Sequence, residues 1–252
     1  MAKHTLLYIV QQVLNDLDSD EVNSIDDTIE SQQVANIVRD CYEEIISNRN
    51  WPHLKKLVQF DSLADLNKPT YLKLPENVKE VVFFKYDKRT VDKDYLQSRM
   101  VEYKYPDEFL KYVEGRKETD ENSMLITDFS GSQFVIKTNQ APEFWTSFDD
   151  SYIVCDAYDS TVDDTLKSAK TQVMAVVEPT WVHLDGAVPD LPSEAFSLLI
   201  AESKSTAALK IKQATDQKAE QQSKRQNQWL SRKAWRAHGG VRYDNYGRTG
   251  KK

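Results

Sequence analysis

Apolar residues in the first fifty positions recur at spacings of three and four, which is the pattern of amphipathic helices. One predicted helix has its apolar face on Leu6, Leu7, Val10, Val13, Leu14 and Leu17. A second, over residues 28–50, has the stronger pattern, on Ile29, Val34, Ile37, Val38, Cys41, Tyr42, Ile45 and Ile46. Asp27, with Glu30 three residues later, predicts a capping box at its start, and Pro52 ends it. We expect two helices joined by a short link to pack antiparallel.

Between residues 57 and 183 the helical period gives way to short runs rich in β-branched and aromatic residues. The predicted strands cover residues 71–74, 78–86, 124–129, 133–138, 152–158 and 171–177. Gly131 predicts a hairpin turn, and Pro106 is placed as at the first turn of a short helix. Because no long helical crossover separates the runs, the region is predicted to be an antiparallel β domain.

The last third returns to a helical pattern. Pro189 and Pro192 break the chain, and Ser193 is a predicted N-cap. The apolar or small stripe consists of Phe196, Leu199, Ile200, Ser203, Ala207, Ile211 and Ala214. Since residues 193–238 hold no proline or glycine, one helix of roughly 40 or more residues is predicted. After residue 214 it is polar all round, which is typical of helices that bridge domains or contact partner chains.

These elements predict an α+β protein in which an N-terminal helix pair and a long C-terminal helix form one helical module, with an antiparallel β domain inserted. The predicted boundaries place the N-terminal helices at residues 1–56 and the β domain at 57–188. The long helix then covers 189–238, and an extended basic tail covers 239–252.

The charge of the chain is uneven. Residues 218–252 contain ten Lys and Arg and two acids, Glu220 and Asp244, for a net charge of +8. Since the whole chain has a formal charge of -7, residues 1–217 carry -15. An acidic body with a basic end indicates a segment that docks on something negative, and the alternative is a solvated helix face.

Cysteine content and hydropathy bear on the compartment. Cys41 and Cys155 lie in apolar runs far apart, which favours two buried thiols in a reducing cytoplasm over a disulfide. The N-terminal apolar stretch is too short and interrupted for a signal peptide, and no window approaches the ~20 apolar residues of a membrane span. We therefore expect no membrane association.

Candidate catalytic chemistry is sparse. None of the four histidines, His4, His53, His183 and His238, lies in a catalytic motif, and neither zinc-ligand spacing nor a phosphate-binding glycine loop is present. The best candidate for a metal or acid–base site is the acidic stretch with Asp149, Asp150, Asp156, Asp159, Asp163 and Asp164. We favour the interpretation that these aspartates cap turns and lie on loop surfaces, and expect no cofactor, metal or catalytic residue.

The basic end is also aromatic. Trp229, Trp235, Tyr243 and Tyr246 share residues 229–252 with seven of the ten basic residues. Such a cluster is typical of nucleic-acid binding and also of protein–protein hot spots. The acidic body favours a partner protein.

A family resemblance is carried by residues 29–35 (IESQQVA), 47–51 (SNRNW), 71–75 (YLKLP), 146–150 (TSFDD) and 191–195 (LPSEA). This order of a helix, a short polar stretch, a tryptophan and a β domain resembles the head-to-tail adaptors of short-tailed bacteriophages, also called tail tubular protein A. The resemblance spans most of the chain and rests on layout as much as on identity.

The resemblance implies a non-catalytic virion protein, assembled in the host cytoplasm, that forms a ring of twelve copies at the head–tail junction. It further implies contact with the portal protein and with the next tail component, a nozzle or tail tube protein, and passage of genomic DNA through the lumen during ejection. The residues expected at the portal are Trp229, Arg232, Trp235, Arg236, Arg242, Tyr243, Tyr246 and Arg248. Two alternatives stay open: a cell-wall-degrading hydrolase of the tail, and a nucleic-acid-binding structural protein.

Overall fold

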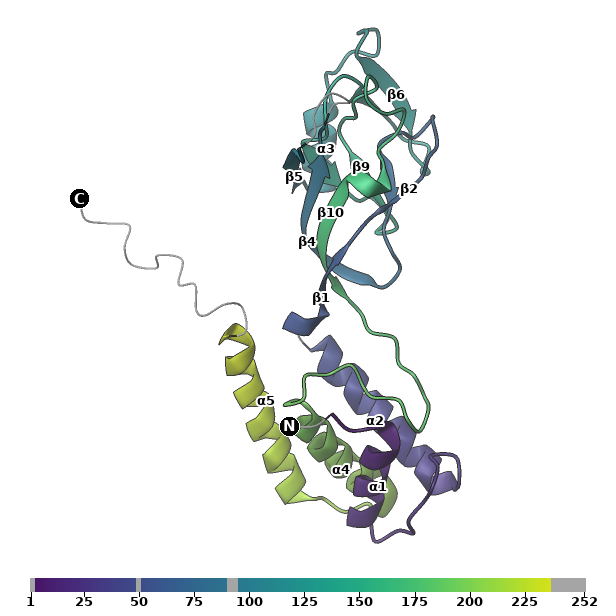
Figure 1. Ribbon diagram of the computed structural model, residues 1–252, viewed down its shortest axis with the longest axis vertical. Coiled ribbons are helices and arrows are strands. Elements are labelled where there is room, and N and C mark those ends of the chain that lie inside the picture. Colours follow the sequence, from purple (N-terminus) through teal and green to yellow (C-terminus); the bar gives the residue numbers. More distant parts are fainter. Residues whose placement is uncertain (1–2, 49–50, 90–94, 237–252) are drawn as a thin grey trace, which may run out of the picture. The chain divides into compact units, whose positions relative to one another are not determined.

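The computed structural model describes residues 3–48, 51–89 and 95–236, with side chains as far as Ser231 at the C-terminal end. The chain divides into two compact units (Figure 1). A helical unit is made from residues 1–54 and 179–252, and a β unit from residues 55–178. The described elements are helices in the first unit and mainly strands in the second, which confirms the α+β class.

The described part of the helical unit contains four α-helices and a short 3-10 turn. They are α1 (Leu6–Asp16), α2 (Ile29–Ser47), η1 (Pro52–Leu54), α4 (Phe196–Lys212) and α5 (Gln217–Arg236). Helices α1, α2 and α4 pack against one another, and α5 packs against α4. The apolar faces predicted for α1 and α2 are mostly buried, although Ile29, the first residue of α2, is exposed.

The capping box of α2 lies one residue later than predicted. Thr28 is the N-cap, and its hydroxyl accepts from the Ser31 amide at 3.0 Å while the Ser31 hydroxyl accepts from the Thr28 amide at 3.1 Å. Asp27 instead accepts from the amides of Asn23 and Ser24, both at 2.8 Å, and so closes the preceding loop. The capping box satisfies a backbone donor that the first turn of the helix leaves unpaired, and Asp27 satisfies two donors of the loop.

Residues 179–188 lie in the helical unit, whereas the sequence pattern placed them in the β domain. They are held there by contacts with α1, with α2 and with the loop between these helices. The Trp181 ring packs on Tyr42 at 5.0 Å, and Asp185 Oδ1 accepts from the Ile25 amide at 2.8 Å. The Ala187 carbonyl accepts from the Leu6 amide, also at 2.8 Å. These partners are far away in the sequence, so local patterning gave no signal for the boundary.

The prediction of a single long C-terminal helix over residues 189–238 is wrong. The chain forms two helices, α4 and α5, joined by residues 213–216, and α5 runs back beside α4 (Figure 1). Gln213 takes a left-handed conformation with φ 54° and ψ 25°, which ends α4 without a glycine. Asp216 Oδ1 then accepts from the amides of Lys218 and Ala219, both at 3.0 Å, and starts α5. Ala195, and not Ser193, is the N-cap of α4.

The described part of the β unit contains ten strands, one α-helix and a second 3-10 turn. The first strands are β1 (Lys55–Val58), β2 (Asp61–Ser62), β3 (Tyr71–Lys73), β4 (Val78–Asp87) and β5 (Ser98–Tyr103), and helix α3 (Pro106–Val113) follows. The remaining elements are β6 (Ser123–Thr127), β7 (Gln133–Lys137), β8 (Phe144–Thr146), β9 (Tyr152–Cys155), η2 (Ser168–Lys170) and β10 (Thr171–Val177).

Eight strands form one sheet in the order β1-β10-β4-β5-β8-β9-β3-β2, and β6 and β7 form the hairpin predicted around Gly131. The neighbours in the large sheet are antiparallel except β5 and β8, which are parallel, so the prediction of a purely antiparallel domain is wrong at one pair. β5 changes partner along its length: residues 98–101 pair with β4, and Glu102 and Tyr103 pair with β8. β1, β2 and β5 carry few buried residues, and β8 is three residues long, so the local pattern did not predict these strands.

The core of the β unit is aromatic. Phe60 and Phe84 are fully buried with ring centroids 5.2 Å apart, and Phe84 also contacts Trp145 edge to face at 6.4 Å. Phe109, from α3, packs against Phe134 of β7 at 6.2 Å and ties the helix and the hairpin to the same core. Edge-to-face geometry adds to the free energy gained by burying these rings.

Candidate protein-binding surface

Helix α5 contacts α4 through a narrow stripe of mostly small side chains. Ala219, Ser223 and Leu230 are buried, at spacings of four and seven residues that place them on one face. The Ser223 hydroxyl donates to the Glu202 carboxylate of α4. Most other described side chains of α5 are exposed, so most of the circumference of the helix faces solvent.

The exposed face of α5 combines basic and aromatic side chains. Lys218, Arg225 and Trp229 are all exposed, Trp229 by 47%. Their spacings of seven and four residues place them on one side of the helix, at about 100° per residue. Glu220 is the one acid in the sequence of α5, and it pairs with Lys224 at 2.6 Å. The face of Lys218, Arg225 and Trp229 therefore carries positive charge around an exposed indole, the composition of a hot spot for a partner protein.

The residues predicted to contact the portal fall into three groups. Trp229 is described and exposed. Arg232, Trp235 and Arg236 lie in the last turns of α5, where the structure describes the backbone and not the side chains. The other four, Arg242, Tyr243, Tyr246 and Arg248, lie outside the described residues.

Helical spacing brings some of these positions together and separates another. Arg232 and Arg236 follow Trp229 by three and seven residues, so their positions continue the face of Lys218 and Arg225. Trp235 follows Trp229 by six residues, which places its position about 120° away around the helix. Lys218, Arg225 and the positions of Arg232 and Arg236 thus share a face with Trp229, and the position of Trp235 lies outside it.

Two aspartates of the acidic stretch, Asp149 and Asp159, stabilise turns, as the sequence interpretation expected. Asp149 Oδ1 accepts from the amides of Ser151 and Tyr152, both at 3.0 Å. Asp159 Oδ1 accepts from the amide and hydroxyl of Thr161, at 3.0 and 2.6 Å. These are the local side-chain to backbone hydrogen bonds typical of aspartate in turns.

Asp156 does not lie on a loop surface. Its side chain is fully buried, and Oδ1 accepts from the amides of Glu143 and Phe144, both at 3.0 Å. Oδ2 pairs with Arg116 Nη2 at 3.2 Å, and Arg116 Nη1 donates to the Asp156 carbonyl at 2.8 Å. The pair joins the end of α3 to β8 and β9, so this carboxylate organises the fold.

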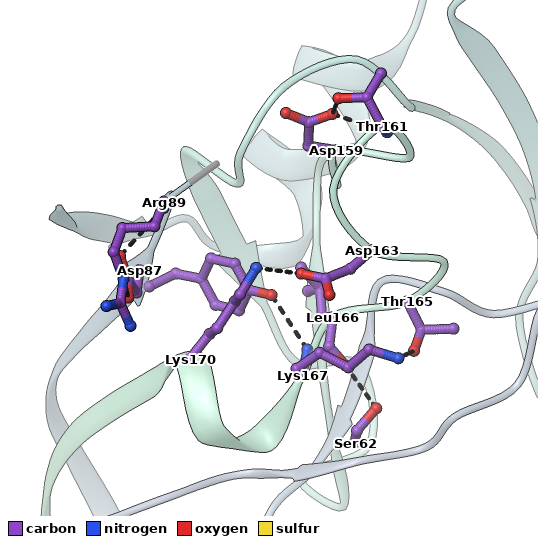
Figure 2. A network of polar contacts seen from close by, with 11 residues as sticks. Ser62, Asp87, Arg89, Asp159, Thr161, Asp163, Thr165, Leu166, Lys167 and Lys170 are labelled. Atoms are coloured by element: carbon purple, nitrogen blue, oxygen red, sulfur yellow. Dashed lines mark hydrogen bonds and ion pairs between the residues drawn. The ribbon is translucent and has the colours of Figure 1, made fainter. Parts of the chain in front are cut away.

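A second polar network connects β4 with residues 159–170 (Figure 2). The Asp87 carboxylate accepts from Arg89 Nε at 2.7 Å and from the Gln97 amide at 3.1 Å, and Asp163 pairs with Lys170. The Tyr86 hydroxyl accepts from the Lys167 amide at 3.1 Å. Burial raises the pKa of Tyr86, so its hydroxyl stays neutral. Both carboxylates are paired with cations and hold backbone segments in place, which is a structural use of these groups.

Several exposed apolar and aromatic side chains on and between β5 and α3 were missed at the sequence level. They are Met100, Tyr103, Tyr105, Leu110 and Tyr112, each between 39% and 64% exposed. Tyr103 contacts Tyr105 edge to face at 5.4 Å, and the Lys104 ammonium lies 4.2 Å from the centroid of the Phe144 ring. The run Tyr-Lys-Tyr-Pro at residues 103–106 was the available signal, because two exposed tyrosines flank a lysine there.

The comparisons with known proteins give no family assignment: no protein-family model matches the chain, and no curated protein is significantly similar to it. Among the described residues, no helix is long and apolar enough to cross a bilayer. The same residues contain no group of three or more His, Cys, Asp or Glu side chains arranged to hold a metal ion.

Proposed function

We propose that this protein is a structural adaptor of a short-tailed bacteriophage, which joins the portal ring to the tail. The observation that carries the proposal is the exposed face of α5 formed by Lys218, Arg225 and Trp229, which leads directly into the basic C-terminal segment. In this role the face and the segment after it bind the portal protein. Copies of the chain form a ring, the β unit contacts the nozzle or tail tube protein, and genomic DNA passes through the lumen.

The division of the chain into units supports an adaptor. The first and last segments fold together in the helical unit, and the β unit is a continuous insertion between residues 54 and 179. One unit is thus available for the portal and the other for the tail component. Three of the aspartates that were the best catalytic candidates, Asp149, Asp156 and Asp159, accept hydrogen bonds from backbone amides, which is a structural use that supports an assembly role.

Charge distribution supports passage of DNA. Residues 1–217 carry a net charge of -15, and an acidic lumen would repel the phosphate backbone and keep the genome from adhering. The basic residues are concentrated at the C-terminal end, where the proposal places the portal. The same separation disfavours the chain as a free DNA-binding protein.

A substitution at the exposed face tests portal binding. The triple variant Lys218→Gln, Arg225→Gln, Trp229→Ala removes two charges and the indole while leaving Ala219, Ser223 and Leu230 in place. If Trp229 is a hot spot, affinity for purified portal rings of the virus that encodes the chain falls by at least about thirty-fold. Biolayer interferometry measures this, and circular dichroism checks that the helices persist.

The matched control removes the same charge from the β unit through Lys111→Gln and Lys117→Gln, both exposed. It is expected to bind portal rings like the unmodified chain. Truncation after Ser231 keeps the buried Leu230 and removes the rest of the basic end, and it should abolish attachment. If both the triple variant and the truncation still decorate portal rings in negative-stain images, portal binding through α5 is refuted. If the triple variant loses salt-sensitive binding to duplex DNA but still binds portal rings, the nucleic-acid alternative is supported instead.

A further inference from the structure

The turn between α4 and α5 has no residue that requires the helix to end. Residues 193–238 contain neither glycine nor proline, and Gln213 and Ala214 are both good helix formers. Gln213 nevertheless adopts the left-handed region, with φ 54° and ψ 25°. A non-glycine residue there is strained relative to the helical conformation. A continuous helix through residues 213–216 would remove this strain and add backbone hydrogen bonds.

The folded-back form is held by a few identifiable contacts. Asp216 caps α5 through two hydrogen bonds, and the Ala214 amide donates to the Ala208 carbonyl at 3.2 Å to close α4. Beyond the turn, Leu230 is the one large apolar side chain among the buried residues described in α5. The strained turn is therefore held in place by the cap at Asp216 and by the narrow stripe of α5 that packs on α4.

The surface of α4 that α5 covers is complementary to α5, since the structure shows the two packed together. Opening the turn would expose the buried stripe of α5 and the surface of α4 that α5 covers in the same chain. A second copy in the same open form offers the identical helix and the identical surface. Exchange between two copies restores every α4–α5 contact and changes only the turn.

We propose that α5 exchanges between copies of this protein: residues 213–216 become helical, α4 and α5 form one continuous helix, and α5 packs on α4 of a second copy. The occupant of the α4 surface is thus α5 of a neighbour. The exchange carries the face of Lys218, Arg225 and Trp229 away from its own helical unit. It is a property of the chain alone and does not rest on portal binding.

Two substitutions at the turn shift this equilibrium in opposite directions. Asp216→Ala removes the cap that only the folded-back form uses, and it places a strong helix former in the continuous helix. An exchanged dimer opens two turns, so its dissociation constant should fall by about 25-fold. Gln213→Gly relieves the left-handed strain and weakens the continuous helix, so the constant should rise by about 25-fold or more. Sedimentation velocity of the full chain over a concentration series measures both.

Gln221→Gly is the matched control, because Gln221 is exposed and lies inside a helix in both forms. It should weaken α5 equally in the two states and leave the dissociation constant within about two-fold. If the two turn variants and the control shift association equally, or if the chain stays monomeric in all of them, the exchange is refuted.

Cross-linking identifies the exchanged contact itself. One population carries Glu202→Cys and a differently tagged population carries Ser223→Cys, since these side chains are in contact and the native Cys41 and Cys155 are buried. After mixing, a short bis-maleimide should link one copy of each, and more so in the Asp216→Ala background. Cross-links that form only when both cysteines are on the same chain would overturn the proposal, even if the protein dimerises through another surface.

Discussion

The ion pair between Arg116 and Asp156 gives a sharp test of how the β unit is held together. Replacing Arg116 with methionine keeps an unbranched stem in contact with its surroundings and removes the guanidinium charge that faces Asp156. The Asp156 side chain is fully buried and that of Arg116 is 9% exposed, so solvent cannot replace the lost partner. We expect Arg116→Met to lower the free energy of unfolding of the β unit by about 3–5 kcal/mol, because it leaves a buried carboxylate without its cation.

Asp156→Asn should be less damaging. The asparagine carbonyl oxygen can still accept from the amides of Glu143 and Phe144, which Asp156 Oδ1 now contacts at 3.0 Å. Arg116 keeps its hydrogen bond to the carbonyl of residue 156 at 2.8 Å and its position 4.8 Å from the centroid of the Tyr112 ring. The loss should be about 1–3 kcal/mol, as for one charge-assisted hydrogen bond. The double variant should lose less than the sum of the two, because no unpaired charge remains.

Hydrogen exchange of residues 144–155 is the assay, because the chain has two units and a whole-chain unfolding curve mixes them. The control is Lys111→Met, which breaks the exposed pair of Lys111 and Asp107 on α3, 3.9 Å apart, and should change stability by less than about 1 kcal/mol. The reasoning is wrong if Arg116→Met perturbs exchange no more than Asp156→Asn does.

Three further predictions follow from single side chains. Leu230→Ala should weaken the docking of α5 on α4 by about 2–4 kcal/mol, seen as faster exchange of the described α5 amides with α1 unchanged. Burial by itself raises the pKa of Asp87, but hydrogen bonds from Gln97 and Arg89 outweigh it and lower that pKa. The ionised Asp87 carboxylate therefore stabilises the fold above the ordinary aspartate pKa near 4, and this contribution is lost as pH falls through the lowered pKa of the folded state. The urea midpoint of Asp87→Asn should consequently fall less steeply on acidification than that of the unmodified chain. Burial raises the pKa of Tyr42 to about 12. The contribution of its neutral hydroxyl to stability is therefore complete below about pH 10 and is lost as pH rises through 12. Spectrophotometric titration of the tyrosines, compared with that of Tyr42→Phe, checks this.

Elements with a strong local pattern were predictable. The face of α2, the hairpin at Gly131 and the bounds of β10 follow from periods of 3.6 and 2 and from a turn glycine at φ 86°. The burial of Asp156 could not be predicted, because its charged partner Arg116 is 40 residues away and the sheet order brings them together. On the candidate surface, the exposure of Trp229 was expected from the sequence. That Trp229 and Trp235 lie on different sides of the helix could be worked out only once the structure showed that both belong to α5.

The wrong prediction of one long helix has a physical cause that bears on assembly. Local propensity favours helix through residues 213–216, since the only contrary signal there is Thr215 followed by Asp216, a capping residue. The packing of α5 on α4, with Leu230 buried and Ser223 bonded to Glu202, decides for the folded-back form. When propensity and packing oppose each other over so few contacts, the free-energy difference between the two forms is small, and a binding partner can reverse it by its differential affinity.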